Sequence, residues 1–171
     1  MQPSIRRLGV EDASALVALR REALETEPLA FAASAADDAA LMIESVRAFL
    51  GTPDTQAVYG AFDGSRLVGM IGLFKATRLK QCHKAMIWGM YVQPHHRRAG
   101  LGHALLNGAI EQARTWSVEQ LQLSVAEPAA AAKHLYEAAG FRVWGTEPRA
   151  LHWNGRFVTE HHLALDLTKS P

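Results

Sequence analysis

The stretch from residue 85 to residue 116 constrains the fold more than any other part of the chain. An apolar run, Ala85 to Val92, is typical of a β-strand, and Pro94 stops it. A basic turn with two glycines follows. A helix is then expected from Leu101 to Trp116, with apolar residues at core spacing: Leu105, Leu106, Ala109, Ile110 and Ala113. The stretch therefore predicts a strand, a glycine turn and a helix in direct succession.

The rest of the chain predicts further strands and helices. Strands are expected at 4–8, 56–62, 66–75, 121–125 and 141–144, and helices from residue 11, at 38–50 and at 129–139. Asp63-Gly64 and Asn154-Gly155 predict hairpin turns, the second between arms at 148–153 and 156–167. Gly140 is expected to end the last helix in the left-handed conformation. The predicted fold is α/β (α+β), in the order β-α-α-β-β-β-α-β-α-β-β, as a single domain over residues 1–171.

Composition excludes several classes of function. With 49% hydrophobic residues, 20% charged residues and a formal net charge of +1, the chain has no global field that would attract nucleic acid or an anionic membrane. No apolar stretch approaches the ~20 residues that cross a bilayer, and the first residues lack an apolar signal core. The single cysteine, Cys82, predicts a reducing, cytoplasmic setting. The pairs His95-His96 and His161-His162 would point to opposite faces of an extended chain, so no metal site is expected.

The glycine turn, His95 to Gly102, has the residues of an anion site. A helix start carries unpaired N–H groups and a partial positive charge. Gly100 and Gly102 allow a close approach, while Arg97 and Arg98 add donors that suit phosphate oxygens. A solvated basic loop is the alternative when the turn is taken alone. No Lys and Ser/Thr follow the glycines, and a GxGxxG motif lacks its third glycine, so a P-loop and a dinucleotide site are excluded.

Two motifs carry a resemblance to a known family. "MYVQPHHRRAGLGHALL", residues 90–106, is similar to the acyl-CoA pyrophosphate loop of the GNAT superfamily of N-acetyltransferases, and "AAAAKHLYEAAGF", residues 129–141, to its second signature. The resemblance is sharp over residues 90–141 and compatible in element order from residue 4 to 167. It implies a mixed sheet that splays in its centre, flanked by about four helices, with the pantetheine arm in the split. Acetyl-CoA is therefore the expected co-substrate, with no metal.

The resemblance also assigns site residues. Tyr136 aligns with the usual proton donor to the leaving thiolate, and core packing is its alternative role. Gly89 is expected to form a bulge that frees the backbone groups after it, the alternative being a packing accommodation beside Trp88. The positions that align with cofactor-binding residues are Met90, Tyr91, Val92, Arg97, Arg98, Ala99, Gly100, Leu101, Gly102, His103, Ala129 and Ala132.

Two positions depart from the family pattern. Ala129 stands where the family often has an asparagine that bonds near the cofactor, and Ser124 stands where some relatives have a base glutamate. The general base stays open among Glu127, the histidines and a water chain to bulk solvent. Cys82 has two interpretations. It is either a nucleophile that becomes acylated in a two-step mechanism or a residue of an exposed hairpin end, beside Lys80, His83 and Lys84.

The expected function is direct transfer of an acetyl group from acetyl-CoA to a primary amine on a small molecule or peptide. A non-catalytic acyl-CoA-binding or sensing module of the same fold is the alternative. Nucleic acid and membrane partners are not expected, and a homodimer is left open. The acceptor pocket is expected from Trp144, His152, Trp153 and Phe31, with core packing as the alternative for each.

Overall fold

The computed structural model describes residues 3–168, and its elements follow the predicted order. Seven strands form one sheet in the spatial order β1-β2-β3-β4-β5-β7-β6. The strands are β1 (Ser4–Arg7), β2 (Gln56–Asp63), β3 (Arg66–Lys75), β4 (Lys84–Val92), β5 (Gln120–Ala126), β6 (Arg142–Trp153) and β7 (Arg156–Asp166). The α-helices are α1 (Ala13–Thr26), α2 (Ile43–Leu50), α3 (Leu101–Thr115) and α4 (Ala130–Ala138). The predicted α/β fold is confirmed.

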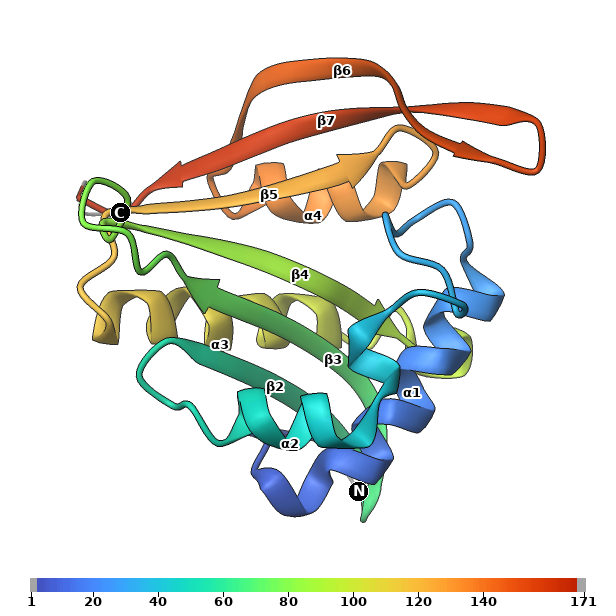
Figure 1. Cartoon of the computed structure of the whole chain (residues 1–171), viewed down its shortest axis with the longest axis vertical. Helices are drawn as coiled ribbons and strands as arrows, with labels where there is room; N and C mark the ends of the chain where they lie inside the picture. The colour runs from blue at the N-terminus through green and yellow to red at the C-terminus, as the bar shows by residue number, and fades with distance from the viewer. Residues whose placement is uncertain (1–2, 169–171) are drawn as a thin grey trace.

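Helices cover both faces of the sheet (Figure 1). On one face, α1 and α2 bury Leu16 and Val46 against Val58 and Met70 of β2 and β3. On the other face, α3 and α4 pack on a larger core, whose members include Ile71, Leu105, Leu106, Leu121, Phe141 and Leu163. Alternate residues of β4 enter the two cores, because successive side chains of a strand point to opposite faces. Tyr91 faces α1, while Met90 and Val92 face α3.

The sheet is held together at its centre by one short parallel contact. Only residues 84–86 of β4 pair with residues 120–122 of β5, and every other strand pair is antiparallel. Beyond that contact the two strands diverge toward their carboxyl ends (Figure 1). The predicted central splay is therefore confirmed, and it leaves the last part of β4 without a ladder partner on the β5 side.

A β-bulge at Gly89 accompanies the divergence. Met70 pairs with Tyr91 and Gly72 pairs with Trp88, so that Gly89 and Met90 together face Ile71. Gly89 has a φ of 66°, a left-handed conformation that glycine adopts without steric cost. Trp88 packs over Gly72, where an added Cβ would overlap its indole ring. The predicted bulge is thus present, and the glycine that accommodates Trp88 is Gly72.

The expected helix over residues 38–50 is wrong in its first part. A 3-10 helix, η2 (Ala39–Leu41), comes first, and Met42 is extended with φ −94° and ψ 112° before α2 begins. The Asp38 carboxylate accepts a hydrogen bond from the Ala40 N–H at 2.7 Å and forms an ion pair with Arg20 at 2.6 Å. These contacts hold the chain in a turn, which intrinsic helix propensity does not overcome.

The first helix is also shorter than predicted at its start. A 3-10 turn, η1 (Val10–Asp12), precedes α1, and the Asp12 carboxylate accepts from Arg6 at 2.7 and 2.8 Å and from the Gly9 N–H at 2.9 Å. These hydrogen bonds from Arg6 lower the pKa of Asp12. The strand expected at 141–144 is longer than predicted, because residues 142–153 form β6 as one bulged strand along β7.

The turn residues behave as predicted. Gly64 has a φ of 59° in the β2–β3 turn, and Asn154 and Gly155 have φ values of 48° and 75° between β6 and β7. Gly140 follows α4 with a φ of 98°. Within residues 3–168, no helix combines the length and apolar character that a membrane crossing requires.

Replacing Gly89 by alanine tests the bulge. A left-handed conformation costs an L-residue about 1–2 kcal/mol, so Gly89→Ala should lower the free energy of unfolding by about that amount in urea denaturation. Gly145→Ala is the matched control, because Gly145 is a strand glycine outside the left-handed region, where an added Cβ would lie 3.9 Å from His162. Equal stability of the two variants would contradict the strain assigned to residue 89.

Candidate functional site

A cavity of about 80 Å³ lies where β4 and β5 diverge. Gly89 and Met90 from β4, Ser124 from β5 and Tyr136 from α4 contribute to its wall. Ala129 and Ala132, at the start of α4, complete this side of the wall. Four of the residues predicted from the sequence, Met90, Ala129, Ala132 and Tyr136, therefore meet at one cavity although they lie far apart along the chain.

The turn before α3 presents a row of free backbone donors. No described residue supplies a hydrogen-bond acceptor for the N–H groups from Arg98 to His103. Arg98 and Gly100 have positive φ values of 64° and 77°, and backbone turns of this kind form concave anion sites. Around Gly100, a Cβ would find no atom within 4 Å, so the approach to these N–H groups is open. Together with the partial positive charge of a 15-residue helix, these donors can hold an anion.

The start of α3 adjoins the cavity. An ideal Cβ on Gly102 would lie 3.3 Å from Leu135 Cδ2 of α4 and 3.5 Å from Met90 Cε of β4. The small residue lets the three elements approach closely, because a larger side chain would separate the helix from the strand. One elongated ligand can therefore contact the free N–H groups and enter the gap between β4 and β5.

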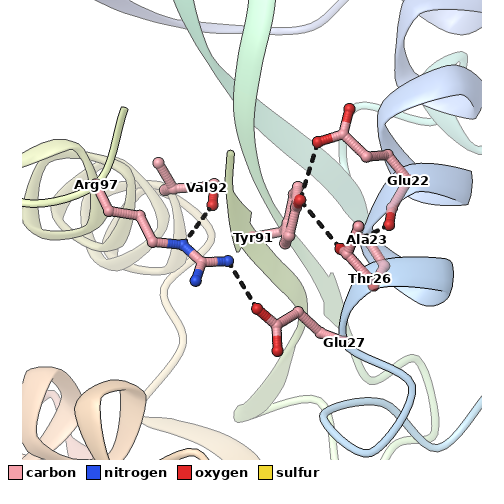
Figure 2. Close-up of polar contacts among 7 residues, drawn as sticks. All are labelled: Glu22, Ala23, Thr26, Glu27, Tyr91, Val92 and Arg97. Atoms are coloured by element: carbon pink, nitrogen blue, oxygen red, sulfur yellow. Dashed lines mark hydrogen bonds and ion pairs between the residues drawn. The ribbon is translucent and has the colours of Figure 1, made fainter. Parts of the chain in front are cut away.

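Arg97 is tied to the end of α1 in this structure (Figure 2). Its Nε donates to the Val92 carbonyl oxygen at 2.9 Å, and its Nη2 forms an ion pair with Glu27 at 2.9 Å. The guanidinium carbon lies 5.8 Å from the centre of the Tyr91 ring. Arg98 and His103 are exposed on the anion turn. Arg97 thus links β4 to α1, while Arg98 is the arginine at the open side of the turn.

Tyr91 anchors the same strand end from inside the core. Its hydroxyl donates to Glu22 Oε1 at 2.9 Å and lies 3.2 Å from Thr26 Oγ1 (Figure 2), while Gln93 Nε2 donates to Glu22 Oε2 at 2.7 Å. Burial, together with the Glu22 carboxylate, raises the pKa of Tyr91. The phenol therefore stays protonated and acts as a donor. This network fixes the direction in which β4 leaves the sheet.

Tyr136 is buried beside the cavity. Only 5% of its surface is exposed, and its ring packs edge to face with Phe141 at a centroid distance of 5.8 Å. Burial raises the pKa of Tyr136. The phenol therefore remains protonated through neutral pH, so a proton is available at the wall of the cavity. Tyr136 therefore packs in the core and also lines the cavity, so the two alternatives given for it from the sequence do not exclude each other.

A wider groove of about 730 Å³ lies beyond the cavity, between the α1–α2 connection and the β6–β7 hairpin. Phe31, His152 and Trp153 line it, as the sequence predicted for an acceptor pocket. Phe31 borders both the groove and the smaller cavity. Trp144 is absent from both walls, is 63% exposed, and packs its ring 5.4 Å from the ring of His162. The interpretation of Trp144 as a pocket residue is therefore wrong.

A buried arginine supports the wall that the two spaces share. Arg20 Nε donates to Asp38 at 2.7 Å, and its guanidinium lies 4.6 Å from the centre of the Phe31 ring. Its Nη1 is buried and has no hydrogen-bond partner among residues 3–168, and it lies 3.7 Å from the position of a Cβ on Gly89. Neither motif includes Arg20, and its pairing with Asp38 depends on the three-dimensional path of the α1–α2 connection.

Comparison with known proteins assigns the family. Residues 16–141 match the model of the acetyltransferase (GNAT) family. The chain belongs to this family. A GNAT-family acetyltransferase of Streptococcus pneumoniae is 29% identical, with a TM-score of 0.85 over 96% of this chain and 99% of that one. The ribosomal-protein-alanine N-acetyltransferase of Brucella melitensis is 25% identical, with a TM-score of 0.83 over the same shares.

A third structure shares the fold. The structure of yncA from Salmonella typhimurium, solved with its cofactor acetyl-CoA, has a TM-score of 0.85 and 20% identity, and the match covers 100% of this chain and 97% of that one. No curated protein gives a significant match. The family membership predicted from the two motifs is thus confirmed. The acceptor of this GNAT domain has to be inferred from the residues of its own site.

Several candidate residues of the GNAT domain lie outside both spaces. Cys82 is exposed in the β3–β4 connection, next to the paired end of β4, and its Sγ donates to the Leu79 carbonyl at 3.2 Å. Glu127 is exposed after β5 and lines neither space. His95 and His96 lie in a 3-10 helix, η3 (Pro94–His96), so the extended geometry assumed for them is wrong. Pro94 starts this turn, because its fixed φ suits the first helical position.

Sequence reasoning missed one polar chain in the GNAT domain. Ser124 Oγ lies 2.9 Å from His162 Nδ1, and His162 Nε2 lies 3.1 Å from Glu147 Oε2. His161 Nδ1 contacts Thr146 Oγ1 at 3.0 Å, and its register partner Val125 belongs to the α3 side of the core. The two histidines therefore point to opposite faces, as predicted. Among residues 3–168, no group of three His, Cys, Asp or Glu side chains is arranged to hold a metal ion.

The Arg97–Glu27 pair should contribute little to stability. Both side chains are more than two-fifths exposed, and exposed pairs of this kind couple by about 0.2–1 kcal/mol. A double-mutant cycle with Arg97→Ala and Glu27→Ala, measured by urea unfolding, should give a coupling in this range that falls as salt is added. A salt-independent coupling above about 2 kcal/mol would contradict a solvent-screened pair.

Proposed function

We propose that this GNAT domain transfers an acetyl group from acetyl-CoA directly to a primary amine. The run of unpartnered N–H groups from Arg98 to His103, at the start of α3 and beside the split in the sheet, carries the proposal. Such donors suit the diphosphate of coenzyme A. The Salmonella yncA structure, which has the same fold, contains acetyl-CoA. The single cysteine supports a cytoplasmic setting for the reaction.

The diphosphate binds the N–H groups from Arg98 to His103, with Arg98 as an additional charged donor. The pantetheine arm follows Met90, Tyr91 and Val92 of β4, a segment that has no ladder partner in β5 and whose Val92 carbonyl oxygen accepts from Arg97 instead. Ala129 and Ala132 lie on the opposite wall and leave room for the chain. In this mode the thioester reaches the region of Gly89 and Tyr136, at the far end of the cavity from the anion turn.

Chemistry in this site requires a neutral amine, a stabilised oxyanion and a proton for the thiolate. A backbone N–H of β4 past the bulge donates to the developing oxyanion. Tyr136 supplies the proton to the departing thiolate, whose conjugate acid has a pKa near ~8.5. Burial raises the pKa of Tyr136, which keeps the phenol protonated but weakens it as an acid. The transfer is favoured because a thiolate formed in the same desolvated cavity becomes more basic as well. The acceptor amine approaches through the groove lined by Phe31, His152 and Trp153.

The wall of the groove favours an acceptor with an apolar body. Leu24, Leu29, Phe31, Leu151 and Trp153 supply apolar surface, and Glu25 adds an acidic group that attracts an ammonium. The Brucella neighbour is named for a protein amine, and the groove of about 730 Å³ has room for a small molecule or a peptide N-terminus. The proposed acceptors are therefore primary amines that carry an aromatic or aliphatic group.

Gly100→Val tests the cofactor site. The β-branched side chain would cover the free N–H groups, so acetyl-CoA affinity should fall by at least about tenfold in calorimetry, equivalent to about 1.4 kcal/mol. Gly155→Val is the matched control, because both glycines have φ near 75° and neither has an atom within 4 Å of an added Cβ. Both variants place valine at a similar positive φ, and only the first alters the anion turn. Equal acetyl-CoA affinity in the two variants would contradict the cofactor site.

Tyr136→Phe tests the proton donor. The change keeps the contact of the ring with Phe141 and deletes the hydroxyl, so kcat should fall by ~10² or more while acetyl-CoA affinity stays within about twofold. The rate of CoASH release in the presence of a panel of amines measures kcat. Turnover within about twofold of the unmodified protein would remove Tyr136 from the reaction. Acetyl-CoA binding without CoASH release by the unmodified protein would identify an acyl-CoA-binding module instead.

A further inference from the structure

A three-residue polar chain runs from the cavity to the protein surface. Ser124 lies at the cavity wall on β5, directly opposite His162 of β7 in the strand register. Their side chains are in contact, with Ser124 Oγ 2.9 Å from His162 Nδ1. The other ring nitrogen, His162 Nε2, lies 3.1 Å from Glu147 Oε2 of β6. Three neighbouring strands thus contribute one residue each to a continuous chain of hydrogen bonds.

The chemistry of the groups sets the direction of these hydrogen bonds. A carboxylate only accepts, so His162 Nε2 carries the proton and donates to Glu147. His162 Nδ1 then has a lone pair, which accepts the hydroxyl proton of Ser124. With its own proton engaged, the Ser124 oxygen has lone pairs left to accept an N–H at the cavity. Every bond in the chain is therefore oriented to move a proton from the cavity toward His162.

Acidic groups surround the imidazole. Glu147 comes from β6, and Glu160 lies two residues before His162 on the same face of β7, opposite Glu147 in the register. Burial raises the pKa of Glu160, while its interaction with His162 lowers it. The β5 neighbour, Ser124, is uncharged. The imidazole of His162 is 26% exposed, so a proton that reaches it can pass to bulk solvent.

We propose that Ser124, His162 and Glu147 form the proton relay that deprotonates the acceptor amine. The inference rests on the proposed acetyl transfer and assigns its missing base. The ammonium gives one proton to the Ser124 oxygen as the Ser124 hydroxyl proton moves to His162 Nδ1. The neutral amine then forms the C–N bond to the acetyl carbon, and the C–S bond breaks. Tyr136 gives its proton to the departing thiolate and the second amine proton restores the phenol, so the products are the amide, CoASH and one proton that leaves through His162.

Each residue has a distinct role. Ser124 contacts the amine, and His162 receives the proton through it. Glu147 is a positioning residue, because it acts through the imidazole by fixing the tautomer and stabilising the imidazolium. Glu127, the acidic candidate on the loop after β5, lines neither space and takes part in neither of the two hydrogen bonds that join Ser124, His162 and Glu147.

The kinetic test compares His162→Gln with His161→Gln. Both variants remove an imidazole from β7, but His161 contacts Thr146 on the opposite face. With acetyl-CoA and 2-phenylethylamine at pH 7, His162→Gln should lower kcat/KM by ~10² or more, and His161→Gln should change it by less than about twofold. Acetyl-CoA affinity should stay unchanged in both. Glu147→Gln should cause a smaller loss in the same direction.

The pH profile separates proton transfer from a structural effect. The deficit of His162→Gln should shrink as pH rises, because more of the amine is then already neutral in solution. It should also shrink with trifluoroethylamine, a weakly basic amine that is neutral near pH 7. A deficit that is constant across pH and across the two amines would overturn the relay, as would an acetyl adduct on Ser124 detected by mass spectrometry.

A second readout does not depend on turnover. In nitrogen NMR of the unmodified protein, neutral His162 should carry its proton on Nε2, and Ser124→Ala should shift the Nδ1 resonance. A proton on Nδ1, or no response to Ser124→Ala, would overturn the relay even if the protein is active. Failure of the unmodified protein to release CoASH with any amine would count against the proposed transfer. Normal turnover of His162→Gln would count against the relay alone.

Discussion

The divergence of β4 and β5 is the constraint on which the rest of the site depends. The two strands share only three paired positions, and a bulge at Gly89 then sends β4 away from its neighbour. Had the ladder continued, the backbone groups of β4 would have been used within the sheet and the cavity beside Tyr136 would not exist. A break in the centre of a sheet exposes polar backbone, which costs free energy unless a ligand or water satisfies it. The fold therefore keeps a binding site at the place where its own hydrogen bonding is incomplete.

The two ends of this site carry opposite electrostatic character. At the start of α3, free N–H groups and Arg98 provide a positive environment suited to a diphosphate. Across the split, β6 and β7 bring Glu147 and Glu160 close to His162, which suits a group that must lose a proton. Met90 and Tyr136 lie between these regions on apolar walls. Charge is thus placed where the proposed substrates would carry it, while the overall net charge stays close to zero.

Local signals account for the parts of the structure that were predicted well. Gly64, Gly140 and Gly155 mark turns because a positive φ is a property of a few residues of chain. The α3 helix follows from the spacing of its apolar residues, and the Gly89 bulge from an isolated glycine in a strand. The predictions failed where distant residues intervened. Asp38 turns the chain before α2 because Arg20 of α1 holds its carboxylate, and no local pattern contains that pair.

By itself the sequence determined the order of elements, the two GNAT motifs and the residues that could form the anion turn, because these depend on neighbours within about one element of the chain. Only the tertiary structure decided which polar side chains meet. Ser124, His162 and Glu147 are joined by the pairing of β5, β7 and β6, and that register is specified by the packing of the whole sheet. In the same way, Arg97 was predicted at the anion turn, but the position of α1 directs it to Glu27. Long-range pairing has no local sequence signal, because the free energy that selects it comes from a core assembled from many segments.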